Sequence, residues 1–328
     1  MPDGAPLTTA RLRELVRGAE AILGEAGVPS PRHDAHALAA WCLGLDRLEW
    51  FRLPRGDEPL AEALPDGATV DLVPRFAAAV ERRRAREPLQ RIVGRAAFRH
   101  LVVEVADDVF VPRPETEVVA QAAIDEAAAL RARGAEPLVV DLCCGSGIIG
   151  ISVAVEVPGS RVLAVDASPA AVAATRRNAE RSGAVGHRAV LGDVAAPGLW
   201  AELDGQVDVV VANPPYIPPD AVPRDPEVRD HDPDLALYGG GADGLEVPRA
   251  VVRAAARLVR PGGLFVMEHA EVQSAAVRAA LAEAGAFEDV ETRQDLTGRD
   301  RMVVARRRDH ATGPLAAPGR PDVEHSPS

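Results

Sequence analysis

The amino-acid sequence predicts an α/β fold, in which a mainly parallel sheet with helices on both faces follows a small helical region. Two observations predict it. From residue 138 onward, short apolar runs alternate with longer stretches of helical periodicity, and the runs end in polar or glycine-containing turns. Before residue 88, apolar residues recur at helical spacing. Strands that alternate with helices specify a parallel sheet covered on both faces.

The first 87 residues are predicted to form a helical bundle. A helix over 8–27 can be capped by Thr8 or Thr9, and Gly27 and Pro29 stop it. Further helices are expected over 32–43 and 71–86. Many arginines lie on or just beyond the third helix. They are interpreted either as a solvated helix end or as a docking patch for an acidic or RNA-containing partner.

A short β-hairpin is predicted to link the bundle to the sheet. Alternating residues over 98–105, followed by the apolar run 109–111, are typical of such a hairpin. A loop with the sequence Pro112-Arg113-Pro114-Glu115 comes next, and a helix is expected over 116–131.

The remaining elements build the sheet. Apolar runs predict strands over 138–142, 161–165, 187–191, 207–212 and 263–268, and helical patterns lie at 147–156, 169–183, 245–259 and 271–284. Residues 286–292 and 301–306 are expected to add a final antiparallel pair. The chain after Arg308 is rich in Pro, Gly, Ser and charge, so it is predicted to be disordered.

Composition argues against some classes of protein. The chain has 328 residues and a net charge of −12, which disfavours a protein that binds chiefly by neutralising nucleic-acid phosphates, although a local basic patch remains possible. Its three cysteines form no CxxC pair and join no histidine cluster at metal spacing, so no metal is expected and a reduced, cytoplasmic setting fits best. We see no signal peptide and no apolar stretch of the roughly 18–20 residues that span a bilayer.

The most informative motif is Asn213-Pro214-Pro215-Tyr216, directly after the apolar run 207–212. Two prolines stiffen the loop and remove two backbone donors, which leaves carbonyls to accept hydrogen bonds. Asn213 adds an acceptor and a donor, and Tyr216 adds a flat face with a polar tip. The combination suits a clamp for a planar NH2 group. The alternative is a proline-rich turn at the end of a strand.

A second site is predicted where the run 138–142 passes through Cys143-Cys144-Gly145-Ser146-Gly147 into a helix. Glycines there allow backbone NH groups to approach a ligand closely. Asp166 ends the following strand, where a carboxylate can accept both hydroxyls of a ribose. Asp193 ends the next one and is either placed to meet an adenine amino group or part of a plain turn. Asp141 is either a structural cap of the turn or a ligand for an amino group. A nicotinamide enzyme would share these features, although the turn is not a clean G-x-G-x-x-G.

These motifs, taken in order, resemble those of the HemK/PrmC family of protein-(glutamine-N5) methyltransferases. The similarity covers roughly residues 70–306. The loop Val111–Glu117 resembles one that separates this family from most DNA adenine methyltransferases that share Asn-Pro-Pro-Tyr. Further matching stretches are Pro88-Leu89-Gln90 with Gly94 and Phe98, Asp232-Pro233, Leu235-Ala236-Leu237, Gly240-Gly241, Asp243-Gly244-Leu245 and Asp295–Arg301.

The resemblance implies a Rossmann-like class I methyltransferase domain over 113–308. A linker hairpin over 88–112, a helical substrate-recognition domain over 1–87 and a disordered tail over 309–328 complete the expected organisation. The implied cofactor is S-adenosyl-L-methionine, with ligands at Asp141, Cys143, Cys144, Gly145, Ser146, Gly147, Asp166, Asp193, Val194 and Asn213. The substrate amide is expected at Asn213, Pro214, Pro215 and Tyr216, with Arg113 and Glu115 beside it, and catalysis at Asn213, Pro214 and Tyr216.

Two positions in the cofactor region depart from the family. Cys143 replaces a turn glycine, and Val194 replaces an aromatic residue found in many members over the adenine. The Asn213–Tyr216 motif is intact. These departures bear on contacts to the cofactor more than on the chemistry of transfer.

The implied reaction is methylation of a protein glutamine. The family's substrates are the Gly-Gly-Gln glutamine of bacterial class I release factors or a glutamine in a ribosomal protein. We expect no direct nucleic-acid binding and no association with a membrane. Two alternatives remain open from the sequence: a DNA or RNA amino methyltransferase that uses a flipped base, and a cofactor-binding translation protein without catalysis.

Overall fold

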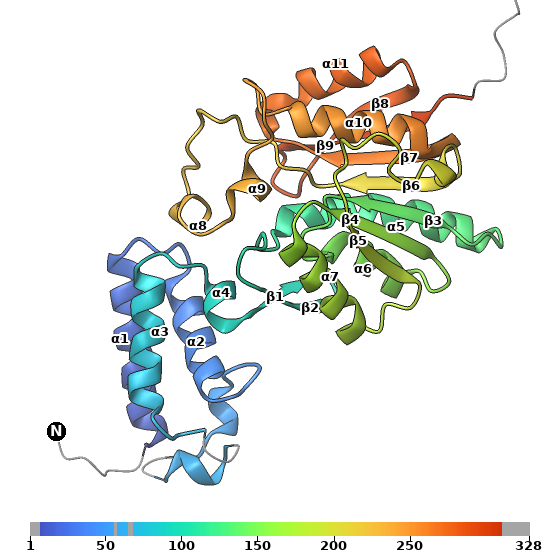
Figure 1. Ribbon diagram of the computed structural model, residues 1–328. Coiled ribbons are helices and arrows are strands. Elements are labelled where there is room, and N and C mark those ends of the chain that lie inside the picture. The colour runs from blue at the N-terminus through green and yellow to red at the C-terminus, as the bar shows by residue number, and fades with distance from the viewer. Residues whose placement is uncertain (1–6, 56–57, 65–67, 310–328) are drawn as a thin grey trace, which may run out of the picture.

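The computed structural model describes residues 7–55, 58–64 and 68–309, and it consists of a helical bundle and an α/β region joined by a small hairpin (Figure 1). In the bundle, α1 (Thr9–Glu25), α2 (Pro31–Cys42), α3 (Leu72–Arg84) and α4 (Leu89–Val93) enclose one apolar core, with short turns η1 (Trp50–Arg52) and η2 (Leu60–Glu62). The predicted helices over 8–27, 32–43 and 71–86 are confirmed. Thr8 caps α1, because its hydroxyl accepts from the amide of Arg11 at 3.3 Å.

The predicted hairpin is present, but its position in the sequence differs. β1 (Arg95–Phe98) pairs with antiparallel β2 (Leu101–Glu104), so the turn falls at residues 99–100. The expectation of strand structure over 109–111 is wrong, because Asp108 has a φ of 60° and Pro112 follows. Val109 and Val111 are buried in the loop, which accounts for the apolar run without a strand.

The α/β region contains a seven-stranded sheet of order β5-β4-β3-β6-β7-β9-β8. Its parallel strands are β3 (Leu138–Leu142), β4 (Arg161–Asp166), β5 (His187–Leu191), β6 (Val207–Ala212) and β7 (Val259–Glu268). β8 (Phe287–Gln294) and β9 (Asp300–Arg307) add the antiparallel end. The predicted fold class is therefore confirmed. The one strand that is clearly longer than predicted is β7, which begins at Val259.

Helices cover both faces of the sheet, and the alternation of side chains along β6 shows why. Val209 and Val211 enter the core beneath α5 (Glu117–Ala132) and α6 (Ile148–Glu156). Val210 and Ala212 enter the core beneath α10 (Glu246–Leu258) and α11 (Ser274–Ala284). A strand with both faces buried needs an unbroken apolar run, which is what the sequence has there. The remaining elements are α7 (Pro169–Arg181), η3 (Pro114–Thr116), η4 (Ala201–Leu203), η5 (Glu271–Gln273), α8 (Pro226–Arg229) and α9 (Asp234–Leu237).

Two further observations concern the C-terminal tail and the length of the helices. The prediction of a disordered tail falls on residues 310–328, which lie outside the described residues. Within the described ranges, no helix is both long enough and apolar enough to cross a membrane.

Candidate active site

A cavity of about 700 Å³ opens at the carboxyl ends of the parallel strands. This is where ligands of open α/β sheets bind, because the loops that follow neighbouring strands converge there. Its volume lies in the range of small-molecule and cofactor sites. Of the site residues predicted from the sequence, those that line it are Arg113, Glu115, Cys143, Cys144, Gly145, Ser146, Asp166, Asp193, Val194, Asn213, Pro214, Pro215 and Tyr216. Asp141 and Gly147 are not among the lining residues.

The loop after β6 holds Asn213 in a defined orientation. Its side-chain nitrogen donates to the hydroxyl of Thr116 at 3.2 Å, so Oδ1 is left as an acceptor. Within the described ranges, no residue donates a hydrogen bond to that oxygen and no backbone hydrogen bond uses the carbonyl of Pro214. Two acceptors from adjacent residues therefore remain available at the cavity.

Tyr216 is held by the neighbouring strand. Its hydroxyl donates to Oε1 of Glu268 at 3.4 Å, and its backbone amide donates to the carbonyl of Leu237 at 3.2 Å. Glu268 is only 3% exposed, and burial raises the pKa of its carboxyl to about 7. Burial likewise raises the pKa of Tyr216, so its hydroxyl stays protonated and can donate.

The turn after β3 is shaped by three residues with positive φ: Cys143 at 61°, Gly145 at 56° and Gly147 at 83°. Cys143 thus adopts a left-handed backbone conformation that favours glycine, at a cost of about 1–2 kcal/mol for a residue with a Cβ. The side chain of Thr175 supports the turn by donating to the carbonyl of Gly145 at 2.9 Å. The backbone amides can approach a ligand closely because the turn stays compact.

Asp166 connects this turn to the next strand. One carboxylate oxygen accepts from the amide of Gly145 at 2.8 Å, and the other accepts from the amide of Ser168 at 2.9 Å. Burial raises the pKa of the carboxyl, and these backbone donors oppose that rise. A carboxylate has about four acceptor positions, so these backbone donors leave acceptor capacity for the hydroxyl groups of a ligand.

Asp141 lies behind the turn, completely buried in β3. Its Oδ2 accepts from the amide of Gly150 in α6 at 2.9 Å, and burial raises its pKa to about 7. This geometry corresponds to the structural interpretation of Asp141, which fastens the strand to the helix that follows the turn. Gly147 packs closely against Thr175. A Cβ added at residue 147 would lie 2.6 Å from Cγ2 of Thr175.

The cavity also includes residues that the sequence did not predict as site residues, although several lie in the stretches that resemble the family. Thr116 and Arg301 line it, as do Val228, Pro233 and the segment 235–238. Thr116 follows Glu115 in the loop Val111–Glu117, so the position of its hydroxyl next to a predicted site residue could have identified it. Arg113 lines the cavity, and its guanidinium pairs with Asp232 at 2.5 Å. The carboxylate of Asp232 is therefore held in an ion pair by an arginine of the loop that precedes α5.

Comparisons with known proteins show which proteins the chain is similar to. A model described as the PrmC N-terminal domain matches residues 14–94, and one described as the methyltransferase small domain matches residues 114–224. A release factor glutamine methyltransferase of Bifidobacterium longum is 43% identical, over 90% of this chain and 99% of its own length. One of Streptomyces coelicolor is 46% identical, over 87% and 94%. A 4-amino-L-phenylalanine/4-methylamino-L-phenylalanine methyltransferase of Streptomyces pristinaespiralis is 45% identical, over 74% and 80%.

Proposed function

The chain belongs to the family of release factor glutamine methyltransferases, and we propose that its substrate is the Gly-Gly-Gln glutamine of a class I peptide chain release factor. The reaction is methyl transfer from S-adenosylmethionine to the side-chain amide nitrogen. The observation that carries the proposal is the pair of acceptors at Asn213 and Pro214. The hydrogen bond from Asn213 to Thr116 orients the first of them.

The two acceptors match the two hydrogens of a primary amide. An amide nitrogen is a poor nucleophile because its lone pair is delocalised into the carbonyl. Hydrogen bonds from the NH2 group to Asn213 Oδ1 and to the carbonyl of Pro214 would orient the lone pair and favour positive charge on nitrogen during transfer. Fixed orientation of the reacting groups contributes up to about 7–11 kcal/mol to such a reaction. No general base is needed first, because the proton can leave after transfer.

The residues of the turn and of β4 fit S-adenosylmethionine, which supplies the methyl group as an electrophilic sulfonium. In this proposal the turn 143–147 surrounds its methionine part, and Asp166 accepts hydrogen bonds from the ribose hydroxyls with its remaining acceptor capacity. Asp193 is exposed and reaches the adenine edge, while Val194 packs against the ring in place of an aromatic side chain. Asp141 acts behind the turn, without contact to the cofactor.

The substrate assignment is tested by incubating the protein with labelled cofactor and a bacterial class I release factor, followed by peptide mass mapping. We expect methyl on the Gly-Gly-Gln glutamine. Asn213→Ala should lower kcat about 100- to 1,000-fold, as removal of one polarising group does, with cofactor affinity within about twofold of wild type. Gln206→Ala is the matched control, because Gln206 is an exposed amide outside the cavity.

Other outcomes would redirect the assignment. Transfer to free 4-amino-L-phenylalanine, the compound in the name of the third relative, with none to the release factor would overturn the protein substrate. Binding to nucleic acid that weakens steeply with added salt would support base methylation instead. With a translation factor as substrate, we expect the enzyme to act in the cytoplasm and without membrane contact.

A further inference from the structure

One wall of the cavity is a long segment of the chain, residues 217–238, here called the excursion. It begins directly after Tyr216, and its end returns to pair with Ile217. The amide of Ile217 donates to the carbonyl of Leu237 at 2.8 Å, and the amide of Gly239 donates to the carbonyl of Ile217 at 3.1 Å. The excursion contains only two short helices, α8 and α9, each of four residues. So long a segment with so little regular structure depends on contacts with the rest of the chain for its position.

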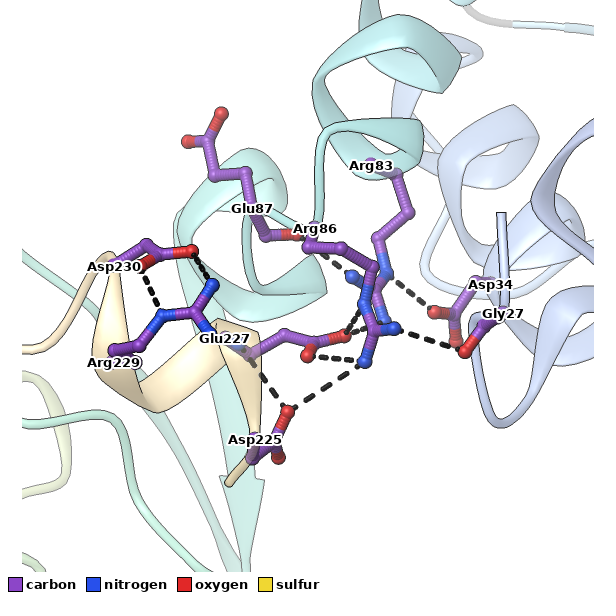
Figure 2. Close-up of polar contacts among 9 residues, drawn as sticks. All are labelled: Gly27, Asp34, Arg83, Arg86, Glu87, Asp225, Glu227, Arg229 and Asp230. Atoms are coloured by element: carbon purple, nitrogen blue, oxygen red, sulfur yellow. Dashed lines mark hydrogen bonds and ion pairs between the residues drawn. The ribbon is translucent and has the colours of Figure 1, made fainter. Parts of the chain in front are cut away.

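Several of those contacts come from the helical bundle, through an ion cluster around Glu227 of α8 (Figure 2). Arg83, on α3, donates to Glu227 at 2.8 Å and to Asp34, on α2, at 2.7 Å. Arg86, just after α3, donates to both oxygens of Glu227 at 2.7 and 2.5 Å. Arg86 also donates to the carbonyl of Gly27, after α1. Three helices of the bundle are therefore joined to the excursion through one carboxylate.

The cluster is buried, so its geometry is restrictive. Arg83, Asp34 and Glu227 are 5%, 5% and 7% exposed. Two guanidiniums face two buried carboxylates, and Asp225 lies at 3.6 Å from Arg86. Burial alone would raise the pKa of Glu227, but the hydrogen bonds that Glu227 makes, with Arg86 first among them, hold that pKa below its ordinary range. Buried ion pairs add little stability compared with apolar packing, whereas the planar fork of arginine fixes the direction of its partner.

A second ion pair fixes the same wall a few residues later. Asp232 lies 2.5 Å from Arg113 of the loop before α5 and 3.4 Å from Arg91 of α4. Between these two anchors lies Val228, and after them come Pro233 and residues 235–238, all of which line the cavity. The wall is thus fixed to the bundle by Arg83, Arg86 and Arg91, which do not line the cavity, and to the loop before α5 by Arg113, which does.

We propose that Glu227 is a positioning residue for the protein substrate. Through Arg83 and Arg86 it fixes the position of residues 228–238 of the excursion relative to the helical bundle. This inference rests on the proposed function, in which the cavity receives a glutamine carried on a protein loop. In this proposal the protein substrate contacts the bundle as well as the cavity, so the relative placement of the two determines its affinity. The cofactor binds at β3 and β4, away from the cluster, and does not depend on it.

The test uses Glu227→Gln, which keeps the shape of the side chain and removes its charge. We expect the KM for the release factor to rise about tenfold, with kcat within about threefold and cofactor Kd within about twofold of wild type. Backbone amides of 228–238 should exchange hydrogen faster, while those of β6 keep wild-type rates. Asp230→Asn is the matched control: Asp230 is on the same short segment but makes its ion pair with exposed Arg229, and it should behave as wild type.

The outcomes separate this inference from the proposed function. If the wild-type enzyme does not methylate the release factor, the proposed function fails. If it does, and folded Glu227→Gln has an unchanged KM or loses cofactor affinity in parallel, the positioning role is overturned. A fall in thermal stability alone, with wild-type KM and wild-type exchange over 228–238, also overturns it. If Glu227→Gln does not fold, Arg86→Gln, whose side chain is 21% exposed, tests the same prediction.

Discussion

Replacing Glu268 with glutamine is expected to reduce the dependence of the unfolding free energy on pH. Burial raises the pKa of this carboxyl from an ordinary 4.5 to about 7. Because the folded-state pKa is the higher one, the stabilisation from protonation is present in full below about pH 4.5 and is lost as the pH rises through about 7. The glutamine cannot ionise, so the variant keeps a neutral side chain at every pH.

The magnitude follows from the two pKa values. One pH unit between them corresponds to about 1.4 kcal/mol, so wild type loses about 3 kcal/mol from this group by pH 8. No discount for solvent screening is needed, because Glu268 is only 3% exposed. Asp141, whose pKa burial also raises to about 7, adds a dependence of the same sign to both proteins. The difference between wild type and Glu268→Gln therefore isolates Glu268.

The assay is urea unfolding of the cofactor-free protein at about pH 5 and about pH 8, by linear extrapolation. The free energy of unfolding of Glu268→Gln, measured relative to wild type, should be about 3 kcal/mol higher at about pH 8 than at about pH 5. Glu283→Gln, an exposed carboxylate on α11, is the control and should show the same difference at both pH values. A difference between Glu268→Gln and wild type that does not change with pH would refute the reasoning.

Three further changes have directions that the structure determines. Asp166→Asn should raise the cofactor Kd roughly tenfold or more by isothermal calorimetry, because hydrogen bonds to a charged acceptor are worth about 1.5–3 kcal/mol; unchanged affinity would contradict the ribose contact. Gly147→Ala should lower the unfolding free energy by about 1–3 kcal/mol, because the Cβ would meet Thr175 at 2.6 Å and φ is positive; a denaturation midpoint equal to wild type would count against it. Gly239→Ala should reduce kcat/KM at least about tenfold with cofactor Kd preserved, because the Cβ would lie 1.9 Å from the carbonyl oxygen of Gly244 and 2.6 Å from that of Pro215, so the loop must shift; wild-type turnover would show that the loop adapts.

The arginines of α3 show where interpretation of the sequence was incomplete. They were expected to form a solvated helix end or a docking patch, and Arg84 is indeed exposed. Arg83 and Arg86 are instead paired with Glu227, which is 144 and 141 positions away. Helical periodicity describes only which residues share a face, so it carries no information about a carboxylate brought in from so distant a segment. Both interpretations were therefore wrong for these two residues.

The amino-acid sequence by itself determined where the parallel strands lie along the chain and that the site lies at their carboxyl ends, whereas the order of the strands in the sheet comes from the structure. An unbroken apolar run such as 207–212 predicts a strand that is buried on both faces, and parallel strands place the ends that carry Asn213, Asp166 and Asp193 at one edge of the sheet. Tertiary structure alone decided which groups hold the motif in place. Thr116 orients Asn213, Glu268 holds Tyr216, and Glu227 joins the bundle to the cavity wall. These partners are set by long-range packing and burial, which local periodicity does not encode.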